Sequence, residues 1–234
     1  MPKSVVILQS SYIPWKGYFD LIHDADVFVF YDDVQFTKND WRNRNRINTS
    51  QGLTWLTVPV GSKLSRRVCD VNIPQNKWQR KHFSTLKMTF AKAPFFEEYF
   101  HLIEDLYINN LWTSLSAMNQ YAIQQIASIL KINTQFIDSR QLKAAGNRNE
   151  RLINIIHELE ADTYISGPSA KSYLQESMFS AEGIEIVWKN YNGYPMYNQR
   201  FSTFEHSVSV LDLIFNLGPN AIDYIWGWRA TNRN

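Results

Sequence analysis

Two short apolar runs near the N-terminus constrain the fold more than any other feature of this sequence. Residues 5–8 and 27–31 are rich in β-branched and aromatic side chains, which is typical of buried strands. Between them, a loop containing Ser, Pro and Gly leads into a short helical pattern at 18–23. Strand, loop, helix and strand in this order predict a βαβ unit with parallel strands.

The same alternation returns in the second half of the chain. Strands are expected at 133–137, 163–165 and 183–188, and helices at 150–160, 169–175 and 208–217. A polar hairpin at 44–48 and 53–60 and a helical insertion at about 76–131 separate the halves, with helices at 78–90, from near Pro94 and at 111–130. We predict one domain over 1–234, an α/β fold with a doubly wound, mostly parallel sheet.

Composition excludes several classes of protein. A hydrophobic content of 44% is ample for a packed core, and an aromatic content of 15% predicts a pocket lined by Tyr and Trp. Cys69 is the only cysteine, so an intrachain disulfide is excluded, and no Cys/His pattern has metal-ligand spacing. Without a signal-peptide pattern or a stretch approaching ~20 apolar residues, we expect a cytoplasmic protein with no membrane insertion.

Positive charge is concentrated in one part of the chain. Residues 38–92 contain twelve Lys/Arg and two acids, a balance of +10, whereas the whole chain carries +2 and the remainder therefore −8. Such a block is compatible with a solvated face, but it also attracts phosphorylated ligands or nucleic acid. We favour an anionic substrate.

The loop after the first strand is the first candidate site, because ligands of parallel sheets bind beyond the carboxyl ends of the strands. Its candidate binding residues are Gln9, Tyr12, Trp15, Lys16 and Tyr18. Gly17 permits close backbone approach and the following helix presents free N–H groups to an anion. The layout resembles HUP-superfamily and other Rossmann-like nucleotidyltransferases, although residues 15–18 lack both histidines of the HxGH motif, which counts against nucleotidyl transfer.

Asp32, Asp33 and Gln35 follow the second strand and form the second candidate. A carboxylate there can act as a general base or hold an amine or a sugar hydroxyl. Neighbouring side chains of an extended segment point in opposite directions, so one Asp is expected to face the pocket, and we favour Asp33 slightly over Asp32. Solvated turn acids are the alternative, and we assign no metal.

Two further segments complete the predicted site. Lys38, Trp41, Arg42, Asn43 and Arg44 combine guanidinium, amide and aromatic groups that suit phosphate, and strand alternation would place Arg42, Arg44 and Arg46 on one face. The same composition suits single-stranded RNA. Ser166, Ser169 and Lys171 follow another predicted strand, where they would either contact an anion or merely cap a helix.

With these residues identified, the chain resembles the WbqC-like family. The resemblance rests on Gln9, Tyr12, Pro14-Trp15, Gly17-Tyr18-Phe19, Ala25-Asp26, Asp32 to Gln35, Lys38, Trp41 to Arg44, 55–60, 92–94, 150–152, 161–164 and 166–169. Ser10 and Ala170 depart from the family pattern, where Pro and Gly are expected. The resemblance implies a role in bacterial surface-polysaccharide (O-antigen) assembly, often beside genes for nucleotide-linked amino sugars, and it transfers no catalytic residue.

Three hypotheses follow. The first is a transferase or ligase that modifies a nucleotide-linked or lipid-linked sugar, with Lys38, Arg42 and Arg44 on phosphate. The second is adenylyl or aminoacyl transfer with ATP or charged tRNA, and the third is a non-catalytic nucleotide-sugar binding module. The expected partner is a phosphorylated small molecule, and cofactor and oligomeric state stay unassigned.

Overall fold

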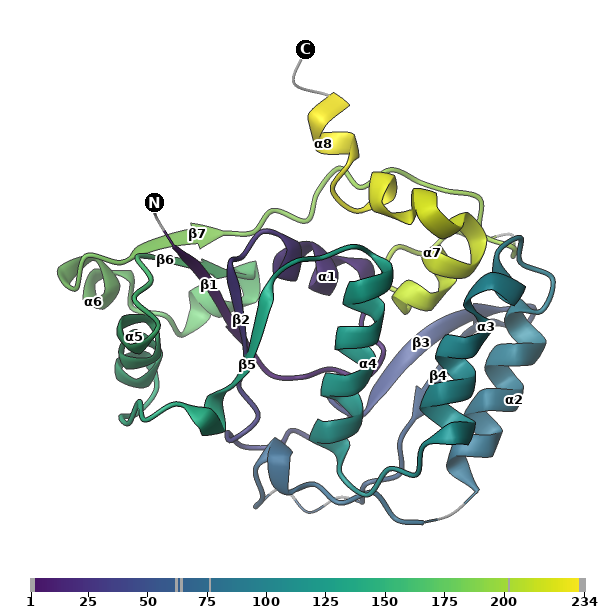
Figure 1. The fold of residues 1–234 in the computed structure, drawn as a ribbon, viewed down its shortest axis with the longest axis horizontal. Helices are drawn as coiled ribbons and strands as arrows, with labels where there is room; N and C mark the ends of the chain where they lie inside the picture. Colours follow the sequence, from purple (N-terminus) through teal and green to yellow (C-terminus); the bar gives the residue numbers. More distant parts are fainter. Residues whose placement is uncertain (1–2, 62, 64, 76, 202, 232–234) are drawn as a thin grey trace.

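A parallel sheet of five strands forms the centre of the computed structural model, which describes residues 3–61, 63, 65–75, 77–201 and 203–231 (Figure 1). The strands are β1 (Ser4–Leu8), β2 (Val27–Phe30), β5 (Gln135–Asp138), β6 (Thr163–Ser166) and β7 (Glu185–Trp188). They lie in the order β5-β2-β1-β6-β7, and every neighbouring pair is parallel. Counted along the chain, this order is 3-2-1-4-5, as in Rossmann folds, and it confirms the predicted α/β class.

Alternating residues of the central strands face two separate hydrophobic cores. Val5 and Ile7 share one core with α5 (Asn149–Glu158) and α6 (Glu176–Ala181). Val6 of the same strand shares the other core with α1 (Lys16–His23) and α4 (Leu115–Ile129), on the opposite side of the sheet (Figure 1). All four residues of β2 are buried, as expected for a parallel strand covered on both faces.

The long excursion between β2 and β5 contains the hairpin and three of the α-helices. The antiparallel strands β3 (Arg44–Thr49) and β4 (Gly52–Thr57) come first, followed by α2 (Trp78–Phe90), α3 (Phe96–Glu104) and α4. A 3₁₀ turn, η1 (Val68–Asp70), precedes α2, and a π-helical turn, η2 (Asp105–Asn109), continues directly from α3. Ile47 and Leu56 of the hairpin belong to the same core as Phe28, so the hairpin and helices are continuous with one face of the sheet.

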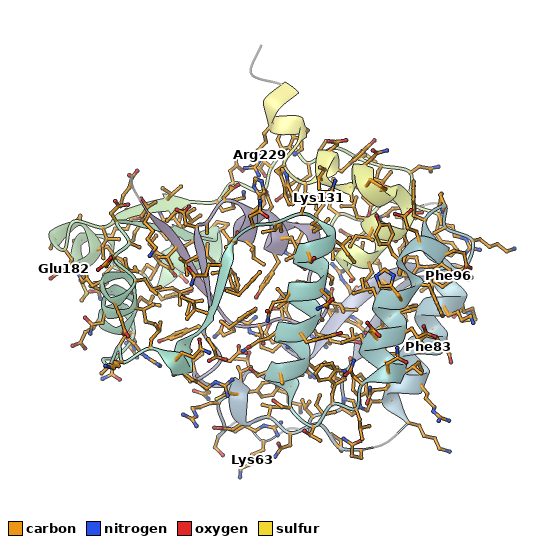
Figure 2. The ribbon with its side chains drawn as sticks, viewed as in Figure 1. Lys63, Phe83, Phe96, Lys131, Glu182 and Arg229 are labelled. Atoms are coloured by element: carbon orange, nitrogen blue, oxygen red, sulfur yellow. The ribbon has the colours of Figure 1, made fainter. Side chains whose placement is uncertain are left out.

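The C-terminal segment returns to the first helix. It contains α7 (Val210–Leu217), η5 (Gly218–Tyr224) and α8 (Trp228–Thr231). Arg229 of α8 forms ion pairs with Asp20 of α1 and with Asp24, which follows that helix (Figure 2). Lys189 pairs with the same two carboxylates, with an Nζ–Oδ1 distance of 2.9 Å to Asp20. These pairs fix the end of the described chain against α1.

Two sequence predictions were wrong in detail. The helix predicted at 169–175 is a 3₁₀ turn, η4 (Pro168–Ser172), followed by the separate α6, with Pro168 at the start of the turn. The second hairpin strand, predicted to reach residue 60, ends at Thr57, before Pro59, because Pro has no N–H to donate to a ladder. Other predicted elements agree within a few residues, and Trp78–Phe90 agrees at both ends. No helix among the described residues is both long and apolar enough to cross a membrane.

Candidate functional site

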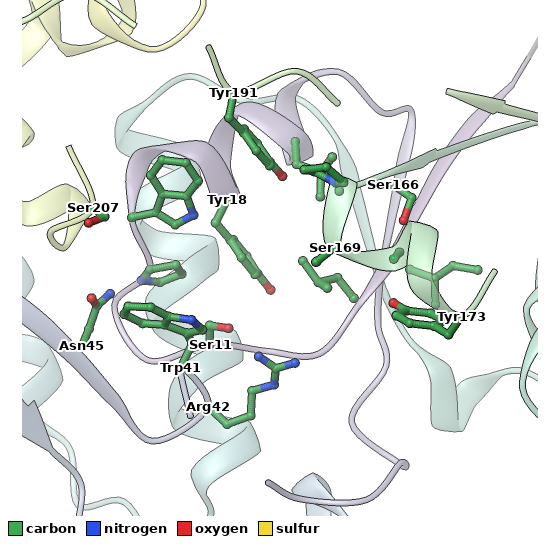
Figure 3. A pocket seen from close by; sticks show the side chains of 18 of the residues that line it. Ser11, Tyr18, Trp41, Arg42, Asn45, Ser166, Ser169, Tyr173, Tyr191 and Ser207 are labelled. Carbon is green, nitrogen blue, oxygen red and sulfur yellow. The ribbon is translucent and has the colours of Figure 1, made fainter. Parts of the chain in front are cut away.

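A cavity of about 400 Å³ lies beyond the carboxyl ends of β1 and β6. These two strands are neighbours at the position where the strand order reverses, which is where ligands bind in open α/β sheets. One wall is formed by Ile7 and Leu8 of β1 and the loop that follows, and the opposite wall by residues 166–170, from the end of β6 onward. Figure 3 shows most of their side chains. The volume is within the ~300–1,000 Å³ typical of small-molecule sites.

Trp15 and Gly17 build one wall of the cavity together. The Trp15 indole folds back over the start of α1, and a Cβ added at Gly17 would lie 2.2 Å from the Trp15 Cζ2 atom. The indole then meets the rings of Tyr191 and Tyr194 edge-on, with ring centroids 5.2 and 6.0 Å apart. Gly17 is therefore needed so that the indole can lie flat against the helix.

Asn45 holds the loop between β1 and α1 in an unusual conformation. Ile13 precedes a proline and has a φ of +35°, a region that β-branched residues rarely adopt. The Asn45 Nδ2 donates to the Ile13 carbonyl at 2.7 Å and to the Tyr12 carbonyl at 3.3 Å. Strained backbone of this kind is often retained at functional sites, and Asn45 itself lines the cavity.

Arg42 is the charged group of the cavity among the described residues that line it. Its guanidinium donates to the Gln9 Oε1 atom, and its Nη1 lies 3.6 Å from an Asp40 carboxylate oxygen. The Asn119 amide donates to the Arg42 carbonyl at 2.8 Å, so backbone and side chain are both held. In Figure 3 the guanidinium and the Tyr18 hydroxyl point into the same part of the cavity.

Hydroxyl groups dominate the remaining polar lining. They come from Ser11, Ser166, Ser169, Ser207 and the tyrosines 18, 164, 173 and 191. Burial raises the pKa of Tyr18, and it raises those of Tyr173 and Tyr191 as well, so these hydroxyls stay protonated at neutral pH. One guanidinium, many hydroxyls and several aromatic rings suit a ligand with one anionic group and a polyhydroxylated, partly apolar body.

Six of the predicted site residues line this cavity. They are Trp15, Tyr18, Trp41, Arg42, Ser166 and Ser169, from three segments far apart in the sequence. Gln9 is not part of the lining but positions it, because its side chain binds Arg42 and its carbonyl accepts the Tyr18 hydroxyl at 3.0 Å. The structure therefore brings together the first, third and fourth predicted segments.

The two predicted catalytic carboxylates are engaged elsewhere and do not line the cavity. Asp32 is fully buried and accepts hydrogen bonds from the Ser10 N–H at 2.8 Å, from Ser116 and from Gln120 at 3.1 Å. Asp33 points the other way, accepts the Ser139 hydroxyl at 2.6 Å and pairs with Arg151. Adjacent carboxylates do diverge as predicted, but both support the ends of β2 and β5, and their catalytic role stays a prediction.

The other predicted binding residues lie outside the cavity lining. Tyr12 is buried against His82 and Tyr107, and its burial raises its pKa. Lys16 is buried beneath the rings of Tyr194 and Tyr197, where desolvation lowers its pKa to about 8.

Four more of the predicted binding residues lie at the surface or in the turn before the hairpin. Gln35 borders a separate shallow hollow with Arg67, and Lys171 lies over the Trp188 ring at 5.2 Å. Asn43 is buried and donates to Val58, whereas Lys38 is exposed.

The predicted single face of three arginines is also incorrect. The strand begins at Arg44, so Arg42 lies in the preceding turn and its side chain faces the cavity. Arg44 and Arg46 do share a face, and both guanidinium groups lie over the ring of Trp55.

Sequence reasoning missed several cavity residues. Asn45, Tyr173, Tyr191 and Ser207 come from the hairpin, from the segment after η4 and from the C-terminal third. The high aromatic content predicted a Tyr- and Trp-lined pocket, but nothing in the sequence indicated which tyrosines form it. Within the described part of the chain, no group of three or more His, Cys, Asp or Glu side chains is placed to hold a metal ion.

The sheet order and the position of its cavity define a Rossmann-like α/β protein. The chain belongs to the WbqC-like protein family, whose model matches residues 9–224, which confirms the resemblance seen in the sequence. Uncharacterized protein Rv1507c of Mycobacterium tuberculosis (strain ATCC 25618 / H37Rv) is 43% identical over 225 residues, covering 95% of this chain and 97% of that protein. No solved structure matches the chain.

Proposed function

We propose that this protein is an enzyme of surface-polysaccharide biosynthesis, a transferase or ligase that modifies a nucleotide-linked or lipid-linked sugar. Membership of the WbqC-like family suggests a polysaccharide-cluster protein. The observation that carries the proposal is the cavity at the strand-order reversal, with aromatic walls, hydroxyl groups and a single guanidinium. Sugar C–H faces pack on aromatic rings, sugar hydroxyls exchange hydrogen bonds with Ser and Tyr, and Arg42 matches a phosphate.

The arrangement of Arg42 supports phosphate binding in particular. Gln9 and the Asn119 amide hold its side chain and backbone before any ligand arrives, so little rotamer freedom is lost on binding. Asp40 lies 3.6 Å away and offsets part of the charge, which favours a ligand with a single phosphate group at this position over a highly charged one. For the acid or base that acts on the acceptor, we propose Asp33 or Asp32 as candidates.

Thermal unfolding with a ligand panel tests this proposal directly. The panel contains sugar 1-phosphates, uridine-, guanosine-, cytidine- and thymidine-diphosphate sugars, ATP and tRNA. A ligand at 100 times its Kd stabilises by about 2.7 kcal/mol, which for a chain of this size raises Tm by roughly 5–11 °C. We expect a sugar phosphate or nucleotide sugar to give this shift.

Two variants locate the binding. Arg42→Ala should lose the shift, while Arg80→Ala, which removes an equal charge from an exposed position of α2, should keep it. Stabilisation by ATP or tRNA alone would overturn the proposal. Wild-type binding by Arg42→Ala would overturn it as well.

A further inference from the structure

The outer face of the β3-β4 hairpin carries an unusual group of exposed aromatic side chains. Trp41 and Trp55 are 42% and 43% exposed, and their rings lie 5.6 Å apart at 36°. Trp41 precedes the hairpin and also lines the cavity, whereas Trp55 is in β4, opposite Arg46. Together the two indoles extend the aromatic wall of the cavity out onto the surface.

Arginine side chains lie over this aromatic surface. The Arg44 guanidinium is 4.2 Å from the Trp55 ring centroid and that of Arg46 is 5.6 Å away. Arg46 is also held by the Ser207 hydroxyl, at 2.5 Å, and Ser207 lines the cavity. No hydrogen bond or ion pair to another described residue is found for Arg44, so its charge is available to a ligand.

The backbone that carries this surface is fixed from below. The Tyr12 N–H donates to the Trp41 carbonyl at 2.8 Å, which ties Trp41 to the loop after β1. The Asn43 carbonyl accepts from the Val58 N–H at 2.8 Å, which ties the same turn to the end of β4. Trp41 and Arg44 are therefore presented by a rigid frame, as preorganised binding requires.

We infer that Trp41, Trp55 and Arg44 form an outer subsite for a nucleoside diphosphate, with the base on the indoles and the phosphates between Arg44 and Arg42. Aromatic side chains bind any base through its π-face, and Arg supplies phosphate contacts and cation–π stacking. The cavity is near the lower end of ligand-pocket volumes, so a two-part ligand would extend past Trp41. The assignment of the sugar to the cavity rests on the proposed function, but the outer subsite does not.

A mononucleotide fits this surface better than a nucleic-acid strand. Two neighbouring indoles offer stacking area for about one base, whereas strand-binding proteins repeat such platforms along a groove. Arg46 is held by Ser207, so the ligand's phosphates would meet two arginines: Arg42, and Arg44, for which no hydrogen bond or ion pair is found among the described residues. The strongly basic balance of 38–92 raises the local concentration of phosphates in either case.

Calorimetric titration of the full chain with uridine, guanosine, adenosine and cytidine diphosphates tests the subsite. Trp55→Ala should weaken the best nucleoside diphosphate about 10-fold or more, while Trp55→Phe, which keeps a ring, should stay within about 3-fold of wild type. Leu53→Ala is the matched control, because Leu53 is 43% exposed and two residues away on the same strand, without a ring. Melting temperatures of all three variants show whether each is folded.

The outcomes separate the subsite from the proposed function. If no nucleoside diphosphate binds the wild type, or if Trp55→Ala binds as well as wild type, the outer subsite is wrong. Sugar 1-phosphate binding that depends on Arg42 would still support the sugar cavity in that case. Tighter binding of a single-stranded ribo-oligonucleotide than of any nucleoside diphosphate, with a steep salt dependence, would overturn the subsite in favour of a nucleic-acid surface.

Discussion

Removal of the Asp32 carboxylate should destabilise the protein before it affects any chemistry. The side chain is fully buried and accepts hydrogen bonds from the Ser10 N–H, the Ser116 hydroxyl and the Gln120 amide. Each buried donor that loses its partner costs about 1–3 kcal/mol, although the costs of neighbouring groups are not additive. We expect Asp32→Ala to lower the unfolding free energy by about 4 kcal/mol, or Tm by roughly 8–16 °C.

The isosteric Asp32→Asn variant sharpens this prediction. The side-chain amide of this variant would place an N–H donor against the Gln120 Nε2 donor. The Gln120 amide cannot simply flip to present its oxygen, because its Nε2 also donates to the Asp138 carboxylate at 2.9 Å. We therefore expect a smaller loss of about 2 kcal/mol. Circular dichroism melts of the two variants and of Asp162→Asn, an exposed control, measure both effects without a known substrate.

If Asp32→Ala melts at the wild-type Tm, the Asp32 carboxylate does not stabilise the fold. If Asp32→Asn or Asp33→Asn instead melts as the wild type does and loses turnover by about 10²-fold once a substrate is known, that carboxylate is the general base.

Three further predictions concern the loop and the start of α1. Gly17→Ala places a Cβ against the Trp15 indole and should lower ligand affinity at the cavity about 10-fold, although Ala itself favours the helix. Unchanged affinity would show that the indole can move freely. Asn45→Asp replaces the donor to the Ile13 carbonyl by an acceptor and should lower the free energy of unfolding, measured in urea, by about 2 kcal/mol. Equal stability would show that Asn45 does not hold this loop. The pKa of Lys16 is about 8 in the native state against 10.5 when unfolded, so between these values the unfolded chain binds more protons and stability rises with pH. Wild type should gain stability over Lys16→Met from pH 8 to 10, and parallel profiles would exclude this titration.

The motifs of the predicted site were partly assembled by the fold and partly separated by it. Trp15, Trp41 and Ser169 meet because β1 and β6 are neighbours in the sheet and the turn before β3 returns to the loop after β1. Asp32 follows a strand on the far side of β1 from β6, so its carboxylate meets α4 and does not meet the cavity. Both outcomes depend on strand order, which no single segment encodes.

The sequence by itself determined the strands, the helices and the Rossmann-like class. Apolar runs and helical periodicity are properties of neighbouring residues, so residues 27–31 and Trp78–Phe90 could be assigned from local pattern alone. Only the tertiary structure decided the membership of the cavity, in which Asn45, Tyr173 and Ser207 join residues more than 100 positions away. It also decided that Lys16 is buried beneath two tyrosine rings while Arg42 faces the cavity. The physical reason is that a side chain's environment depends on which distant segments pack around it, and both cations look equally suited to phosphate in the sequence.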